Sequence, residues 1–129
     1  MKLVVFEPGS DLASELWGTS LRAASSVLCY PEGRAALAGA RRAQRLRATD
    51  YGQALREFES LHDELVLVGI DRLLAQRAGE LAEQFGLRGY DAVHLASAIA
   101  LGPDTTMATW DADLARAAAE CGCAVAGAL

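Results

Sequence analysis

The stretch "RGYDAVHLASAIAL", residues 88–101, carries the strongest structural signal in the chain. After Tyr90 its side chains are almost all small or apolar, which predicts a helix that is buried on most of its surface. Asp91 stands at the head of this run, and His94 follows one turn later. A carboxylate at that position has two interpretations: it caps the helix, or it belongs to a functional site. The rest of the sequence bears on the choice.

The composition is that of one folded domain. The length of 129 residues suits a single domain, and a hydrophobic content of 52% is enough for a real core. No apolar run reaches the roughly 20 residues of a membrane span, and "MKLVVF" is too short for a signal-peptide core. Cys29, Cys121 and Cys123 have neither disulfide-framework nor zinc-site spacing, which indicates buried thiols in a reducing cytoplasm.

The charge distribution is more informative than its sum. A formal net charge of −5 argues against a protein whose whole surface grips nucleic acid. Residues 34–47, "RAALAGARRAQRLR", nevertheless hold five arginines and no carboxylate. This run is either a solvated helix face or a strip that contacts phosphates beside an acidic centre. The second interpretation requires that such a centre exists.

Short apolar runs alternate with longer helical patterns along the chain. Strands are expected at residues 21–24, 65–70, 105–109 and 123–127, and residues 2–6 also have strand composition. Helices are expected at residues 10–17, 25–42, 49–65, 71–85, 90–101 and 111–122. Strands separated by such helices predict a parallel sheet covered on both faces, which is a three-layer α/β/α sandwich in one domain, residues 1–129.

Several helix ends are predicted from local signals. The expected caps are Ser10, then Thr49 or Asp50, and Asp71, while Gly86 and Gly122 should end their helices. Pro31 and Gly33 should kink the helix of residues 25–42 or delay its start.

Four acidic residues are candidates for one site, because ligands of parallel α/β sheets bind beyond the carboxyl ends of the strands. Asp111 and Asp113 follow the strand at 105–109, Asp91 begins the buried helix, and Glu32 lies early in the helix after the second strand. Taken singly, Asp91 and Asp111 could be caps, and Asp113 could favour the helix dipole. Converging carboxylates repel unless a cation neutralises them, and oxygen ligands suit Mg²⁺ or Mn²⁺.

Three stretches resemble successive motifs of one family: "SSVLCYPEGRAALAGARR" (25–42), "LRGYDAVHLASAI" (87–99) and "TWDADLARAAAECG" (109–122). They look like the motifs of PIN-domain ribonucleases, specifically VapC-type toxins of toxin–antitoxin pairs, in order and over nearly the whole chain. The resemblance implies a PIN-like fold and a Mg²⁺- or Mn²⁺-dependent endoribonuclease, silenced by a VapB-type antitoxin and usually dimeric. It implies that Glu32, Asp91 and Asp111 are catalytic and metal-binding residues, that Asp113 is a neighbouring carboxylate, and that Thr109 orients the loop of Asp111.

The N-terminus departs from the family pattern. The family opens with a central strand that ends in Asp followed by Thr or Ser, whereas "MKLVVFEPGSDLASELW" resembles the sequence just after that motif. We therefore expect a PIN-like domain that is N-terminally incomplete. Either residues 3–6 fill the central position and Glu7 becomes a substitute carboxylate, or residues 1–6 form the end of the first helix and the central strand comes from elsewhere. The corresponding alternative function is a catalytically impaired toxin that only binds its antitoxin.

Contacts with partners are predicted on two further sets of side chains. Arg34, Arg41 and Arg42 could hold RNA phosphates or an acidic antitoxin segment. The apolar residues Phe6, Leu12, Leu16 and Trp17 are too numerous to serve only as cover for a sheet, which favours a homodimer and an antitoxin groove. For His94 a hydrogen-bonded core position is preferred to a general base. The single lysine, Lys2, argues against a phosphoacceptor domain.

Overall fold

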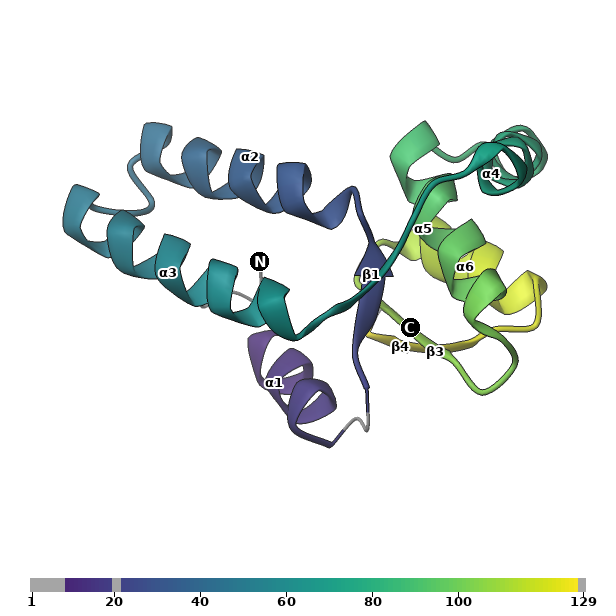
Figure 1. Cartoon of the computed structure of the whole chain (residues 1–129), viewed down its shortest axis with the longest axis horizontal. Coiled ribbons are helices and arrows are strands. Elements are labelled where there is room, and N and C mark those ends of the chain that lie inside the picture. The colour runs from purple at the N-terminus through teal and green to yellow at the C-terminus, as the bar shows by residue number, and fades with distance from the viewer. Residues whose placement is uncertain (1–8, 20–21, 128–129) are drawn as a thin grey trace. The chain divides into compact units, whose positions relative to one another are not determined.

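The computed structural model describes residues 9–19 and 22–127. Residues 3–6 and Glu7, for which we predicted a central strand or a helix end, lie outside these ranges. The chain alternates helices and short strands (Figure 1): α1 (Ser10–Thr19), β1 (Ala24–Ser26), α2 (Cys29–Arg42), α3 (Ala48–Glu64), β2 (Val66–Val68), α4 (Arg72–Phe85), α5 (Gly89–Leu101), β3 (Thr106–Thr109), α6 (Ala112–Glu120) and β4 (Ala124–Gly127). The described residues form two compact units, drawn from Met1–Ala24 with Leu28–Val66 and from Ser25–Val27 with Leu67–Leu129.

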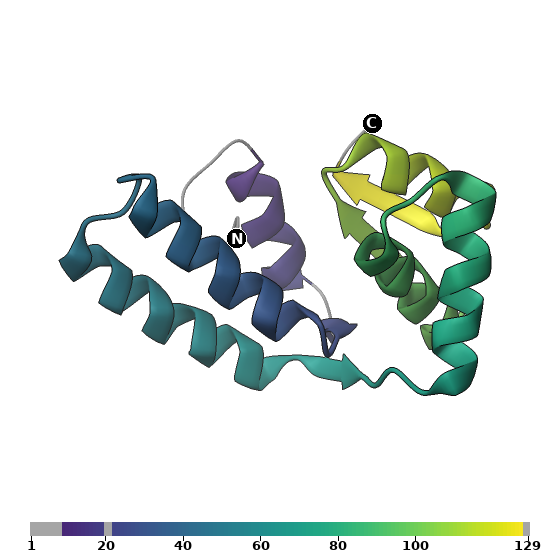
Figure 2. The ribbon, with the colours of Figure 1, turned by 90° about the horizontal axis from the view of Figure 1, so that it is seen from above.

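A hairpin of α2 and α3 forms the core of the first unit. The two helices lie side by side in both views (Figures 1 and 2) and bury Leu37, Ala54 and Phe58 between them. Gly33 is buried against Phe58, where the ring occupies the space of the missing side chain. Pro31 lies in the first turn of α2, where no backbone donor is needed. The predicted delay of the helix start is therefore confirmed, and Gly33 serves the packing.

The second unit has a larger core, to which α4, α5, α6 and β3 contribute. Its fully enclosed side chains include Leu81, Leu95 and Ala118. The predicted caps of α4 are confirmed: the Asp71 carboxylate accepts the Leu74 N–H at 2.8 Å, and Gly86 ends the helix in the left-handed conformation. Gly122, also at positive φ, follows the end of α6 as predicted. The buried character predicted for residues 90–101 is also confirmed.

The parallel strands confirm the α/β class. Strand β3 pairs in parallel with β4, from Thr106 opposite Ala124 to Thr109 opposite Gly127, and β1 pairs with β2. The described strands thus form two two-stranded sheets instead of one wide sheet. Each strand has only three or four residues, and Met107 is the one buried apolar residue that a described strand contributes. Packed helices therefore supply most of the core.

Some local predictions were wrong. Helix α3 begins at Ala48 with Arg47 at the N-cap position and no side-chain cap, because Thr49 and Asp50 are already inside the first turn. Ser10 is the first residue of α1, and the carbonyl of Gly9 accepts the Ala13 N–H. The three cysteines are free, as expected, but they are half-buried, not buried. Within the described ranges, no helix combines the length and the apolar character needed to cross a membrane.

Candidate active site

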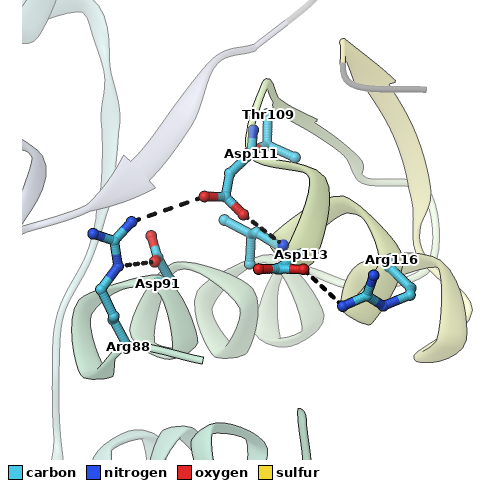
Figure 3. Close-up of polar contacts among 7 residues, drawn as sticks. Arg88, Asp91, Thr109, Asp111, Asp113 and Arg116 are labelled. Atoms are coloured by element: carbon cyan, nitrogen blue, oxygen red, sulfur yellow. Dashed lines mark hydrogen bonds and ion pairs between the residues drawn. The ribbon is translucent and has the colours of Figure 1, made fainter. Parts of the chain in front are cut away.

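Two carboxylates of the second unit face the same guanidinium (Figure 3). Arg88 Nε donates to Asp91 Oδ2 at 3.2 Å, and Arg88 Nη2 lies 3.8 Å from Asp111 Oδ2. Asp91 comes from the first turn of α5, whereas Asp111 lies between β3 and α6, at the N-cap of α6. Packing thus brings together two acids that are 20 positions apart in the sequence.

Asp91 does not cap helix α5. Arg88 occupies the N-cap position of α5 and makes no side-chain cap, while Gly89 and Tyr90 are already helical. The cap interpretation of Asp91 is therefore wrong, because the helix starts at Gly89, two residues before Asp91. Its side chain is only 14% exposed, and such a carboxylate needs a compensating charge. Arg88 supplies that charge.

The two carboxylate oxygens of Asp111 make different contacts. Oδ1 accepts the Leu114 N–H at 2.8 Å and caps α6, so the cap interpretation is confirmed here. Oδ2 is turned toward Arg88. The Thr109 hydroxyl, on a buried side chain, accepts the Asp111 N–H at 3.1 Å. The backbone and one oxygen of Asp111 are thus held in place, which orients the other oxygen.

Asp113 and Glu32 lie in different surroundings. Asp113 is exposed in the first turn of α6, and its Oδ1 accepts from Arg116 Nη2 at 2.7 Å (Figure 3). Glu32 is half-buried in the first turn of α2, after β1, and belongs to the first unit. Its convergence with Asp91 and Asp111, like the participation of Asp113, stays a prediction. Glu7 lies outside the described residues.

Arg88 was not among the predicted site residues. It precedes Asp91 by three positions, a spacing that lets side chains meet on a helix, but nothing local ties it to Asp111. Its guanidinium also lies over the Tyr90 ring, 5.1 Å from the centroid. Tyr90, then the hydrogen bond to Asp91, and more weakly Asp111 raise the pKa of Arg88 above its ordinary value. The group is a permanent cation.

The predicted arginine strip is not one uniform surface. Arg34 donates to Tyr30 and to Glu59 within the α2–α3 hairpin, at 2.9 and 3.1 Å. These contacts raise the pKa of Arg34, the hydrogen bond to Tyr30 most strongly. Arg41 lies over the Tyr51 ring, 5.1 Å from its centroid, and Arg42 is exposed at the end of α2. Arg34 is therefore engaged inside its own unit.

The donor set fits a divalent cation that keeps part of its water. Across residues 9–19 and 22–127, no three His, Cys, Asp or Glu side chains come together as a metal site. Asp91 and Asp111 do present one oxygen each to a common cationic group. Mg²⁺ is often bound through one or two carboxylates, with water and substrate phosphate completing the shell. Asp91 and Asp111 are the residues of this unit that would hold such an ion, in place of Arg88.

Comparisons with known proteins identify the family of the chain. The PIN domain family matches residues 36–120, a range that includes Arg88, Asp91 and Asp111. The chain is 45% identical over 127 residues to Ribonuclease VapC45 of Mycobacterium tuberculosis (strain CDC 1551 / Oshkosh). It is equally similar to Ribonuclease VapC49 of strain ATCC 25618 / H37Rv. Each alignment covers 98% of this chain and 88% of the relative. The chain therefore belongs to the PIN-domain family, among its VapC-type members.

Proposed function

We propose that this protein is a Mg²⁺- or Mn²⁺-dependent endoribonuclease toxin that a cognate VapB-type antitoxin neutralises. The observation that carries the proposal is the Asp91–Asp111 pair, whose Oδ2 atoms face one cation from two different elements. The two mycobacterial relatives, both named as VapC ribonucleases, give it independent support.

The chemistry is hydrolysis of an RNA phosphodiester. A water oxygen bonds to phosphorus, the P–O bond to the leaving group breaks, and the leaving oxygen takes up a proton. A bound divalent cation supplies charge neutralisation at the phosphate and lowers the pKa of a bound water. Asp91 and Asp111 would hold that cation through their Oδ2 atoms, so no Ser or Cys nucleophile is required.

The surroundings of Asp111 suit this task. Its N–H is bound by Thr109, and its Oδ1 is bound by the Leu114 N–H. A ligand whose orientation is already set loses little freedom when it binds a metal ion. Glu32 and Asp113, with Glu7 as a substitute carboxylate, complete the proposed set.

RNA and the antitoxin are the proposed partners, together with a second copy of the chain. Arg41 and Arg42 are exposed and suit phosphate or carboxylate groups better than Arg34, which is bound to Glu59. Leu12 is exposed on α1, and Leu16 and Trp17 are half-exposed, while Phe6 lies outside the described residues. These apolar side chains support the proposed homodimer, which a monomer mass in light scattering would contradict.

The decisive experiment is an RNA cleavage assay of the purified chain in Mg²⁺ or Mn²⁺ and in chelator. We expect cleavage only with the metal ion, and Asp91→Asn should slow it on the order of 100-fold or more. The control is Asp104→Asn. Asp104 is exposed just beyond the opposite end of the 13-residue helix α5, so the variant makes the same charge change away from the pair.

Two results would contradict the proposal. Equal cleavage in chelator would exclude metal dependence, and undiminished cleavage by Asp91→Asn would exclude a role for that carboxylate. If the chain binds the antitoxin and cuts no RNA under any condition, the binding-only alternative is correct.

A further inference from the structure

We propose that Arg88 is a built-in competitor for the divalent cation. Its guanidinium neutralises Asp91 and Asp111 when the cation is not bound, and it has to leave when the cation binds. This inference rests on the proposed metal site, to which it adds a residue that controls occupancy.

Arg88 occupies the oxygen atoms that a metal ion would need. Both of its contacts go to Oδ2 atoms, at 3.2 Å on Asp91 and 3.8 Å on Asp111. Asp111 cannot readily offer its other oxygen, because Oδ1 caps α6 through the Leu114 N–H. Mg²⁺ requires oxygen ligands at about 2.0–2.1 Å, and it would repel a guanidinium held at the same two oxygens. The two cations therefore exclude one another.

Arg88 and Asp91 differ strongly in burial. Asp91 is 14% exposed and needs a positive charge nearby, whereas the Arg88 side chain is 68% exposed. Exposed ion pairs are weak and screened by salt, so Arg88 can leave at little cost. The Tyr90 ring, which one face of the guanidinium already contacts, gives the displaced group a nearby surface.

The test measures Mn²⁺ binding by titration calorimetry on the full chain at low ionic strength. Arg88→Gln should bind Mn²⁺ about three- to tenfold more tightly than the unchanged protein, because two weak ion pairs no longer compete. The matched control is Arg77→Gln. Arg77 is exposed in the same unit, pairs with Glu80 at the same three-residue spacing, and carries the same charge. That variant should bind Mn²⁺ within about twofold of the unchanged protein.

Thermal unfolding gives a second readout that does not depend on activity. In chelator, Arg88→Gln should unfold at a lower temperature than the unchanged protein, because Asp91 has lost its partner. In saturating Mn²⁺ the difference in unfolding temperature between the two proteins should be smaller, because the ion neutralises Asp91 in place of the guanidinium. Added salt should also narrow the affinity difference, since it screens the Arg88 contacts.

The outcomes separate this inference from the proposed function. If Asp91→Asn loses Mn²⁺ binding but Arg88→Gln binds no more tightly than Arg77→Gln, the metal site stands and the role of Arg88 is overturned. If Arg88→Gln shows no Mn²⁺ binding at all, both fail, because removing a competitor should expose any site that exists. Weaker binding by Arg88→Gln would also overturn the inference and make Arg88 a supporting residue.

Discussion

Asp91 and Asp111 look alike in the sequence, since each stands where a helix begins after an irregular or extended segment. Their chemical surroundings differ. Asp111 closes the first turn of α6 with one oxygen, whereas Asp91 lies inside the first turn of α5 and caps nothing. Substitutions at Asp111 can therefore separate the loss of stability from the loss of activity. Asp91 is a useful reference, because it contacts the same arginine but caps no helix.

We predict that Asp111→Ala lowers the free energy of unfolding by about 1 kcal/mol, the usual value of an N-cap. Asp111→Asn should change it little, because Asn caps as well as Asp. Both variants should lose RNA cleavage, since neither offers a carboxylate. Urea unfolding followed by circular dichroism, alongside the cleavage assay, checks this. Equal stability of the Ala and Asn variants would show that the cap contributes nothing.

At the scale of elements, the α2–α3 hairpin depends on one residue without a side chain. Gly33 is buried against the ring of Phe58, and a Cβ built there would overlap that ring. Phe58 also packs against Tyr30, with ring centroids 5.8 Å apart, so the ring has little room to move. Glycine has a low helix propensity, but at position 33 the packing against Phe58 requires it.

We expect Gly33→Ala to destabilise the protein by about 1–3 kcal/mol, because overpacking outweighs the gain of up to about 1 kcal/mol in helix propensity. Gly39→Ala is the matched control on the same helix, where the nearest atom to a new Cβ is the end of Arg42 at 3.9 Å. That variant should be neutral or stabilising. The denaturant midpoints of the two variants measure this difference in stability. Similar midpoints would show that the Phe58 ring moves to make room for the new methyl group.

At the scale of the whole molecule, the net charge of −5 means that any attraction to RNA must be local. The exposed arginines around the end of α2 are the strongest local source of positive charge in the sequence, and Arg34 is already paired with Glu59. Binding of RNA should therefore depend on Arg41 and Arg42 more than on arginines elsewhere.

The double variant Arg41→Gln and Arg42→Gln should weaken RNA binding about tenfold and flatten its salt dependence. Two lost phosphate contacts should reduce the slope of log affinity against log salt by about 1.4 for single-stranded RNA. The control, Arg72→Gln with Arg77→Gln on α4, removes the same charge from exposed positions. Fluorescence anisotropy at several salt concentrations measures both slopes. Equal slopes for the two double variants would assign the effect to net charge alone.

The sequence by itself determined the features that depend on neighbours along the chain. Alternating apolar runs and helical patterns were enough to predict the α/β class and the parallel pairing. The cap at Asp71 and the helix end at Gly86 were predictable because a cap bonds to a backbone group only a few residues away. The order of three motifs was enough to predict the family.

Only the tertiary structure decided which groups meet across elements. The start of α5 two residues before Asp91, and the contact of Arg88 with Asp111, have no signature in local spacing. The requirement for glycine at position 33 also has no local signature, because it arises from the Phe58 ring of another helix. Such contacts follow from how α5, α6 and β3, or α2 and α3, pack together, and packing depends on side-chain volumes from distant segments.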